Sequence, residues 1–436
     1  MEALKKALRS CRRAAWLLLW LVAGVLPMAA QSLYTHPTVS EVRTLRLMVD
    51  GDFRKLPVLE MSGRSQLEIS FDYLADEEQY FQYTVVHCDA DWQQDDLSEL
   101  DYLDGFQPTR VTKVTPSFNT HTNYYHYAIR FPNEEVRLQV SGNYAVIVHG
   151  EGDPDDVVAV ACFSVSEQKA FVGGEVSANT DIDFRQEHQQ LTLQCSWTHQ
   201  QLPYINPASE VRLMVTQNRR PATRRVVKSP SRMEMGKAYY EHVRDLIFEA
   251  GNTYRRFEFT DYRYATLGVE RVRFHAPYYH AELVPDRSRA GGNYLHDKDQ
   301  HGHYLVRALR VDDVDTESEY FWAHFTLDGA MPPKGKGDIY LAGDFTYGEL
   351  TDEWRMEYDP ATNLYSALVL LKQGHYNYQY VVGPDWVPDF SEPVPAISSR
   401  VVEGNYYEAR NQYEVYIYYR PSGSRYDRLL GVGIIE

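Results

Sequence analysis

The sequence predicts an all-β protein built from three β-sandwich domains in series. Short runs of alternating apolar and polar residues recur along the chain, separated by turn signals such as Ser141-Gly142-Asn143. Alternation with a period of two is typical of strands that bury one face in a sandwich. The 34 tyrosines, together with many Val and Thr residues, favour half-buried strands. We find no segment with the period of an amphipathic helix.

Residues 1–30 have the features of a signal peptide. A basic head precedes an apolar run from Ala14 to Val25, which is too short to span a bilayer, and Ala30 provides a small residue at a cleavage site before Gln31. Cys11 precedes the apolar run and so cannot be a lipid-modified cysteine. The mature chain is therefore expected to be exported and soluble, without direct insertion into a membrane.

The mature chain divides into three predicted sandwich domains of the immunoglobulin or E-set type. The first domain, residues 31–167, contains runs such as LEISFDYL and YYHYAIRF and one long loop from Asp89 to Thr122. A polar stretch with glycines, residues 166–175, marks its end. The second domain spans residues 168–288, and the third spans residues 289–436 and begins in a polar linker.

The acidic composition excludes two classes of partner. The formal net charge is −17, and removal of residues 1–30, which carry five basic side chains and one acidic side chain, changes it to −21. Phosphate backbones and anionic lipid surfaces attract basic patches. Nucleic acid and electrostatic lipid binding are therefore not expected, and the charge favours solubility.

Three cysteines remain after cleavage, namely Cys88, Cys162 and Cys195. An odd number leaves at least one free thiol, and their spacing does not match a zinc site. Cys88 and Cys162 both lie in apolar, strand-like runs. A disulfide between them stays open, but we expect buried, reduced thiols that act as small apolar side chains, with no redox role.

Two polar segments resemble metal sites only superficially. Asp89 and Asp91 have a D-x-D spacing, but we interpret these acids as hydrogen-bond acceptors that cap their own loop. The segment HDKDQHGHY, residues 296–304, places Asp297 like the first ligand of a calcium loop, yet the twelfth position is Ala308 instead of a glutamate. We therefore expect a solvated turn there, and no bound metal or cofactor.

The sequence lacks the local motifs of the common enzyme classes. It contains no G-x-S-x-G elbow, no H-E-x-x-H motif and no phosphate-binding glycine loop. Two carboxylates that pair only in the folded protein would leave a glycoside hydrolase as a hypothesis. We predict a protein without catalytic residues.

The C-terminal region resembles glycogen-binding-type modules. IYLAGDF and LVLLKQGHYNYQYVVGPDW follow the strand pattern of these modules, but the asparagine and the first tryptophan of their sugar cradle are missing. Trp354 and Trp386 are the candidate glycan contacts under this alternative, a periplasmic or surface carbohydrate-binding protein.

A resemblance to another family covers nearly all of the mature chain. YTVVHCDADW, YLDGF, PSFNTHTNYYHYAIRFPN and SGNYAVIV resemble the first domain of the type IX secretion system plug protein. VVEGNYYEARNQYEVYIYYRP and GSRYDRLLG resemble the end of the same family. The resemblance implies a non-enzymatic periplasmic protein, monomeric when free, at the inner face of the outer membrane. Its expected partner is the giant translocon barrel, whose periplasmic opening it closes reversibly when no cargo is bound.

The long loop is the predicted region of partner contact, because loops on rigid scaffolds commonly carry recognition. Trp92, Tyr102 and Phe106 are the candidate contact residues within it, since aromatic anchors dominate protein interfaces. The alternative is that these side chains pin the loop onto its own sandwich.

A tyrosine stripe in LVLLKQGHYNYQYVV indicates a strand in a core. Alternation places Tyr376, Tyr378 and Tyr380 on one face and the polar Asn377 and Gln379 on the other. We therefore expect the tyrosine face to be half-buried and packed against the run YEVYIYY, residues 413–419.

Overall fold

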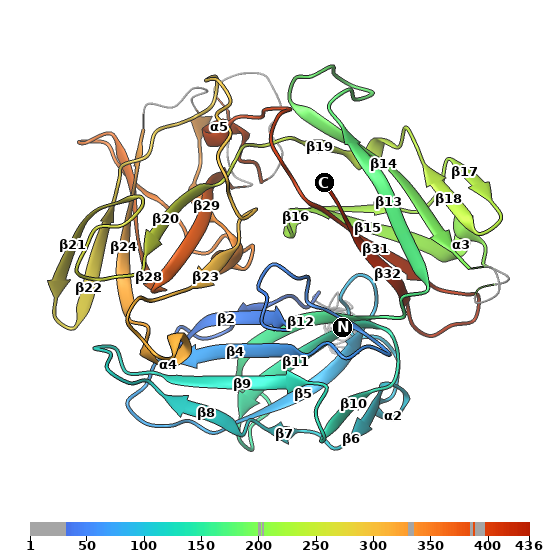
Figure 1. The fold of residues 1–436 in the computed structure, drawn as a ribbon, viewed down its shortest axis with the longest axis horizontal. Helices are drawn as coiled ribbons and strands as arrows, with labels where there is room; N and C mark the ends of the chain where they lie inside the picture. Colours follow the sequence, from blue (N-terminus) through green and yellow to red (C-terminus); the bar gives the residue numbers. More distant parts are fainter. Residues whose placement is uncertain (1–31, 199–201, 203–204, 330–334, 384–386, 389–396) are drawn as a thin grey trace, which may run out of the picture.

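Figure 1 shows the computed structural model of the protein, which describes residues 32–198, 202, 205–329, 335–383, 387–388 and 397–436. Nearly all of its regular structure is strand, so the predicted all-β fold is confirmed. The described residues include four one-turn α-helices, α2 (Glu99–Tyr102), α3 (Pro207–Glu210), α4 (Val314–Glu317) and α5 (Arg400–Glu403), and two 3-10 turns, η1 (Arg244–Leu246) and η2 (Asp344–Thr346). None of the described helices is long and apolar enough to cross a membrane. The predicted signal peptide lies outside these residues.

The first sandwich is formed by two sheets whose inner faces share one apolar core. One sheet has the order β1 (His36–Pro37), β12 (Val157–Ser166), β11 (Gly142–Gly150), β5 (Phe81–Cys88) and β7 (Thr109–Arg110), with β3 (Val58–Glu60) parallel to β12. The other has the order β2 (Val42–Val49), β4 (Leu67–Tyr73), β9 (Tyr125–Phe131) and β8 (Lys113–Pro116). A separate ribbon pairs β6 (Leu103–Gly105) with β10 (Val136–Leu138). Leu67, Ile69 and Phe71 of LEISFDYL face this core, as predicted, but Ser70 and Asp72 on the other face of β4 are buried as well.

The second sandwich combines strands from two distant parts of the chain. One sheet has the order β13 (Ala170–Ser177), β14 (His188–Trp197), β18 (Lys237–Tyr240) and β17 (Arg232–Glu234), with β19 (Ile247–Glu249) also on β14. The other has the order β16 (Arg220–Val227), β15 (Val211–Gln217), β31 (Tyr413–Tyr419) and β32 (Arg428–Ile435). Its core therefore depends on the last strands of the chain.

The third sandwich is formed by residues between β19 and β31. One sheet has the order β20 (Arg255–Phe259), β29 (Gly374–Val382) and β23 (Tyr304–Val306), with β26 (Ile339–Ala342) also on β29. The other has the order β21 (Val269–His275), β22 (Tyr278–Leu283), β24 (Tyr320–Asp328), β28 (Leu364–Lys372) and β27 (Glu357–Asp359). A short ribbon pairs β25 (Gly335–Lys336) with β30 (Val387–Pro388).

The third sandwich is thus inserted into the second, which differs from three domains strictly in series. The expected boundary between residues 288 and 289 falls inside the third sandwich, between β22 and β23. A polar stretch shows where a loop lies, but it does not show which sheet the next strand joins. We propose domains at 32–167, at 168–249 together with 413–436, and at 250–412.

The tyrosine stripe lies on β29 and is fully inside the third core. Tyr376 stacks between Phe257 and Tyr304, with ring centroids 5.2 and 5.4 Å away. The tyrosine face is therefore buried more completely than predicted, and Asn377 and Gln379 on the opposite face are buried as well. The predicted packing of the tyrosine face against residues 413–419 is wrong. Those residues form β31, which pairs with β15 and β32 in the second sandwich.

The three sandwiches lie around a common centre (Figure 1). The first is at the bottom of this view, the third at the left and the second at the right. Each sandwich contacts the other two through hydrogen bonds. Tyr320 of the third bonds to Asp72 of the first, and Tyr418 of the second bonds to Asn143 of the first. Gln189 of the second bonds to a backbone carbonyl of the third. The sandwiches therefore form one continuous body.

The geometry of the first sandwich separates two of the cysteines. Cys88 lies on β5 and Cys162 on β12, and β11 runs between these strands. Two strand spacings amount to about 9.5 Å, whereas a disulfide requires Cα atoms closer than about 7 Å. All three cysteines are buried free thiols, as expected. Burial raises the pKa of the Cys88 thiol to about 12, so the thiol stays protonated at neutral pH.

Candidate partner interface

The long loop of the first sandwich has a fixed base and contains α2, β6, β7 and β8. His87, at the end of β5, lies 2.5 Å from the carboxylate of Asp95, measured from Nδ1 to Oδ2. The Asp89 side chain accepts hydrogen bonds from the backbone N–H groups of Asp91 (2.8 Å) and Gln93 (3.0 Å). The prediction that these acids cap their own loop is therefore confirmed for Asp89, while Asp91 forms ion pairs with arginines of the second sandwich.

Two of the three predicted contact residues hold the loop in place instead of facing solvent. Tyr102 is buried in the first core, and its hydroxyl donates to the carbonyl of Val85 at 3.2 Å. Trp92 is half-buried and packs against the apolar cluster that contains Cys88 and Cys162. The burial of Tyr102 and its hydrogen bond match the alternative in which the ring holds the loop onto its own sandwich.

Phe106 projects from the loop, as a contact residue should. Its side chain is 92% exposed, and that of Leu100 is 88% exposed, which makes them the two most exposed large apolar side chains among the described residues. Leu100 lies on α2 and Phe106 directly follows β6. Exposed apolar side chains on a fixed loop are available for contact with a partner. We call Leu100 and Phe106 the apolar tip.

Leu100 was not predicted from the sequence. It stands alone in the acidic run DLSELD, and a single leucine there carries no periodic signal. The one-turn helix α2 is fixed by local capping, in which Asp101 accepts hydrogen bonds from the backbone N–H (2.9 Å) and the hydroxyl (2.8 Å) of Ser98. Asp101 also pairs with Arg425 of the second sandwich at 2.9 Å, so two neighbouring sandwiches orient the tip.

Gly105 positions Phe106, and its replacement by alanine is expected to be destabilising. Its φ of +147° is unfavourable for other residues, and an added Cβ would lie 2.0 Å from the carbonyl oxygen of Glu135, next to the opposite strand of the ribbon. We expect Gly105→Ala to lower the free energy of unfolding by about 1–3 kcal/mol. Urea denaturation measures this effect. Gly173→Ala is the matched control, because a Cβ there meets no atom within 4 Å, and an equal loss in both variants would contradict the prediction.

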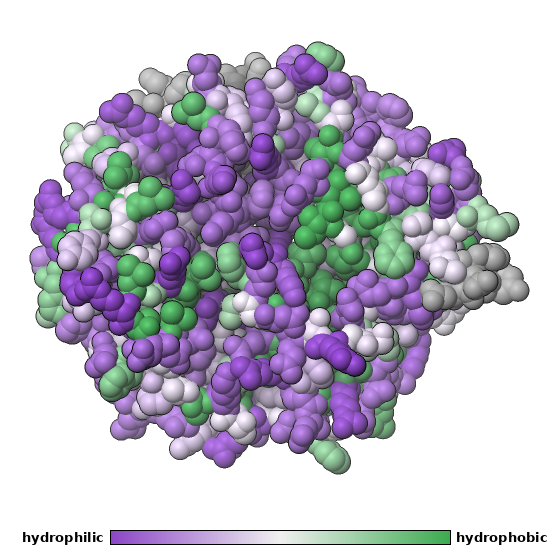
Figure 2. Space-filling model, in the orientation of Figure 1, coloured by the Kyte–Doolittle hydropathy of each residue, from purple (hydrophilic) through white to green (hydrophobic). Residues whose placement is uncertain are grey.

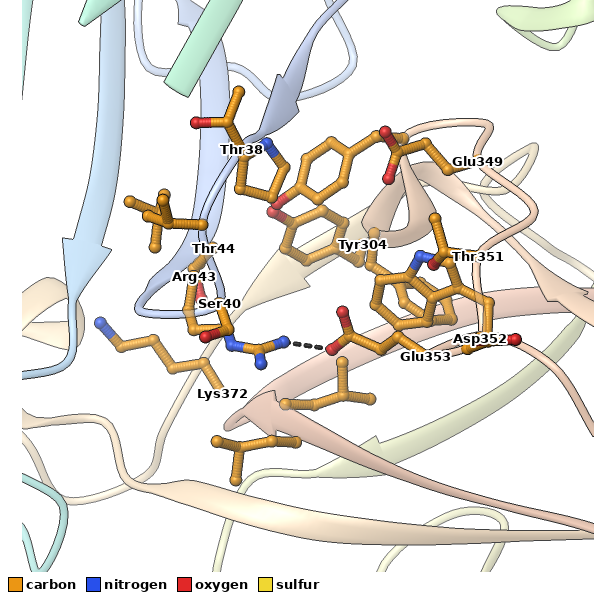
Figure 3. A pocket seen from close by; sticks show the side chains of 18 of the residues that line it. Thr38, Ser40, Arg43, Thr44, Tyr304, Glu349, Thr351, Asp352, Glu353 and Lys372 are labelled. Atoms are coloured by element: carbon orange, nitrogen blue, oxygen red, sulfur yellow. Dashed lines mark hydrogen bonds and ion pairs between the residues drawn. The ribbon is translucent and has the colours of Figure 1, made fainter. Parts of the chain in front are cut away.

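A crevice of about 420 Å³ separates the first and third sandwiches (Figure 3). Arg43 of β2 extends across it and forms an ion pair with Glu353, while Tyr304 forms part of its wall. Nearby, His303 pairs with Asp344 and is buried. The expected solvated turn at residues 296–304 is therefore wrong for its second half, which packs into this junction.

A buried ion pair closes the same junction from within. Nζ of Lys372 lies 2.6 Å from Oδ2 of Asp72, and both side chains are 1% exposed or less. Asp72 also accepts a hydrogen bond from the hydroxyl of Tyr320 (2.7 Å) and contacts Nδ1 of His126 (2.7 Å). Burial opposes ionisation of Asp72, but the charge of Lys372 and the contact with His126 outweigh it and lower its pKa to about 2. The Asp72 carboxylate is thus charged throughout the physiological range.

The junction between the first and second sandwiches is also built from ion pairs. Asp427 accepts hydrogen bonds from Arg212 (2.8 Å) and from the backbone N–H of Ala90 (3.0 Å). Glu167 pairs with Arg428 at 2.6 Å. Burial opposes ionisation of Glu167, but hydrogen bonds from Arg428 and a neighbouring lysine outweigh it and lower its pKa to about 2. The hydrogen bond from Ala90 and the ion pair of Glu167 with Arg428 thus connect the first sandwich to the second.

The glycan platform proposed as the alternative is not formed as expected. Trp354 is 5% exposed and packs edge-on against Phe345 in the third core, with centroids 5.7 Å apart. It cannot stack on a sugar from there. Trp386, the other candidate glycan contact, lies outside the described residues. Among the described residues, no three His, Cys, Asp or Glu side chains are grouped so that they could hold a metal ion.

The fold defines a class of protein, namely an assembly of three β-sandwiches joined into one body. Residues 42–167, the first sandwich, match the family model described as the type 9 secretion system plug protein 1st domain. A crystal structure of a hypothetical protein from Parabacteroides merdae ATCC 43184 is similar to the whole chain, at 38% identity and a TM-score of 0.87, and the match covers 93% of this chain and 99% of the other. No curated protein matches.

The chain belongs to the type 9 secretion system plug protein family. It is therefore a protein related to type IX secretion. The matched family describes a domain of a secretion system and names no catalytic activity.

Proposed function

We propose that this protein is the plug of a type IX translocon, which reversibly occludes the periplasmic opening of the outer-membrane barrel when no cargo is bound. The observation that carries the proposal is the position of the apolar tip. It lies within residues 42–167, the part of the chain that matches the plug family. The proposal also places the protein in the periplasm, at the inner face of the outer membrane through this partner.

The joined arrangement of the three sandwiches supports this role. Ion pairs join the first sandwich to the third through the buried Lys372 and Asp72, and to the second through the partly buried Arg428 and Glu167. A body of about 400 residues has a radius of gyration of roughly 22 Å. Such a body covers a wide opening as one piece, whereas three loosely tethered domains would leave gaps.

The size of the apolar tip fits reversible binding. A plug must leave when cargo arrives, so its interface should resemble the standard size of about 1,200–2,000 Å² instead of a larger obligate interface. Leu100 and Phe106 supply two anchors of the kind that dominate such interfaces. The net charge of −21 expected for the mature chain keeps the released protein soluble.

Two measurements test the proposal. The tagged mature protein should recover a very large barrel protein from detergent-solubilised outer membranes of its own source. In planar bilayers that contain this barrel, addition of the mature protein should lower the ionic conductance, and its removal should restore it. Recovery of no barrel, or recovery with unchanged conductance, would overturn the plug function.

A further inference from the structure

A second cavity of about 420 Å³ lies where the three sandwiches meet, and we call it the central cavity. Each sandwich contributes to its walls, which include Leu47, Trp92, Met214, Tyr254, Val381 and Tyr416. Figure 2 shows hydrophobic side chains gathered on this face of the molecule, over the sheet of β16, β15, β31 and β32. Ligand sites have volumes of about 300–1,000 Å³ and mostly apolar walls. The central cavity has both properties.

The unpartnered polar atoms around the central cavity share one chemical property. Four buried atoms of its lining residues have no hydrogen-bond partner among the described residues, and each carries a hydrogen to donate: Tyr254 Oη, Gln379 Nε2, Arg46 Nε and Arg219 Nε. Tyr254 is 5% exposed and Gln379 is 3% exposed. A buried donor without an acceptor has lost its hydrogen bonds to water and is destabilising. The concentration of such donors around one cavity therefore indicates an occupant with acceptor atoms.

The arginines of the lining favour an anionic acceptor. The guanidinium of Arg219 donates to two backbone carbonyls of the first sandwich, and that of Arg220 donates to the side chain of Gln217. These acceptors carry no net charge. Two positively charged groups at the cavity wall therefore have uncharged hydrogen-bond partners in the part of the chain that the structure describes, and an anion would interact favourably with both.

The carboxylates of the cavity lining are already engaged by other groups. Asp344 pairs with His303, which belongs to the junction with the first sandwich. Glu349 accepts a hydrogen bond from the hydroxyl of Tyr34 at 3.0 Å. These two carboxylates therefore do not accept hydrogen bonds from the unpartnered donors, which remain available to an occupant of the cavity.

We propose that the central cavity binds an apolar organic acid. The hydrocarbon part packs against walls such as Met214, Trp92 and Val381, and the carboxylate accepts hydrogen bonds from the unpartnered donors. Water molecules alone would accept hydrogen bonds from the donors, but they would leave the apolar walls of the cavity in contact with water. The proposal does not depend on the plug function.

Occupation of the central cavity would hold the sandwiches together, because its walls come from all three. A ligand that binds only the assembled protein stabilises it in proportion to the logarithm of its concentration. The ligand would therefore stabilise the arrangement of all three sandwiches, even though it does not contact the apolar tip.

The test uses the full mature chain and cis-parinaric acid, a fluorescent unbranched fatty acid. We expect saturable binding that palmitic acid displaces, and displacement by its methyl ester that is weaker by about tenfold or more, because a charged hydrogen bond is lost. Met214→Trp fills the cavity and should weaken binding by about tenfold or more, because the added ring occupies the space of the hydrocarbon. Leu100→Ala, which changes only the apolar tip, is the control and should bind like the natural protein.

Tyr254→Phe provides a second variant that keeps the ring and removes one unpartnered atom, so we expect it to fold. The Tyr254→Phe variant should bind the acid about threefold or more weakly, because one hydrogen bond to the carboxylate is lost. Its affinity for the methyl ester should be unchanged. Circular dichroism verifies the fold of each variant. Absence of saturable binding to the folded protein, equal affinity for acid and ester, or unchanged binding in both cavity variants would overturn the proposal.

Discussion

Lys372→Met is expected to lower the free energy of unfolding by about 3–5 kcal/mol, because it leaves the Asp72 carboxylate buried and uncompensated. Asp72 is inaccessible at the junction of the first and third sandwiches, and Lys372 lies 2.6 Å from it. Urea denaturation followed by tryptophan fluorescence measures the loss in the first unfolding transition.

Two further variants isolate the ion pair as the cause. Lys113→Met removes a half-exposed lysine that pairs with Glu68 on the same sandwich, and it should change stability by less than about 1 kcal/mol. The double variant Lys372→Met with Asp72→Asn removes both charges and should recover part of the loss. A loss below about 1 kcal/mol in Lys372→Met alone would show that the pair does not hold the junction.

The ion pair of Lys372 and Asp72 also makes the free energy of unfolding depend on pH in the acid range. The pKa of Asp72 is about 2 in the folded protein, against an ordinary value of 3.8. A carboxylate with a lowered pKa contributes stability that is fully present above its unfolded pKa and is lost as the pH falls through the folded pKa. We therefore expect about 2–3 kcal/mol from Asp72 to disappear between about pH 4 and pH 2. Asp72→Asn should flatten this part of the pH profile, and an unchanged profile would contradict the assignment.

Under the proposed plug function, Phe106→Ala is expected to weaken binding to the translocon barrel about thirtyfold, which corresponds to about 2 kcal/mol for a central aromatic anchor. Because the side chain is 92% exposed, its removal should leave the fold intact. Leu100→Ala should act in the same direction. The amount of barrel recovered at a series of protein concentrations gives the affinity of each variant.

Phe184→Ala is the matched control for the apolar tip. Phe184 is 64% exposed but lies in the second sandwich, between β13 and β14. The Phe184→Ala variant should bind the barrel like the natural protein. Equal weakening by Phe106→Ala and Phe184→Ala would indicate nonspecific apolar binding, and no weakening by Phe106→Ala would exclude the tip from the interface.

Local pattern was sufficient to predict much of the fold and one residue of the tip. Period-two alternation of apolar and polar residues predicted strands such as β4 and β29, although both faces of these strands are largely buried in the folded protein. Phe106 was predicted as a contact residue because it is an aromatic residue in a long loop, and loops commonly carry recognition. Tyr102 and Phe106 are both aromatic residues of one acidic loop, and only the packing of α2 distinguishes the buried ring from the exposed one.

Pairing between distant segments could not be predicted in this way. Lys372 follows an apolar run and precedes a turn, which is typical of an exposed lysine, and its partner Asp72 is 300 positions away. The same holds for Trp354, whose burial depends on contacts with Phe345 and the rest of the third core. Alternation shows that a residue faces inward or outward, but it does not show which sandwich lies on either side.

The insertion of the third sandwich has a consequence for the order in which the protein acquires its structure. A chain is made from its N-terminus, and domains generally fold as units during synthesis. The first sandwich has all of its strands by Ser166, but β15 of the second sandwich must wait for β31, where Val211 pairs with Tyr419. The second sandwich is therefore completed last, after the whole of the third has been made. A chain that ends before residue 413 would leave the edge of β15 open to other strands, so intact synthesis of the C-terminus protects the protein from aggregation.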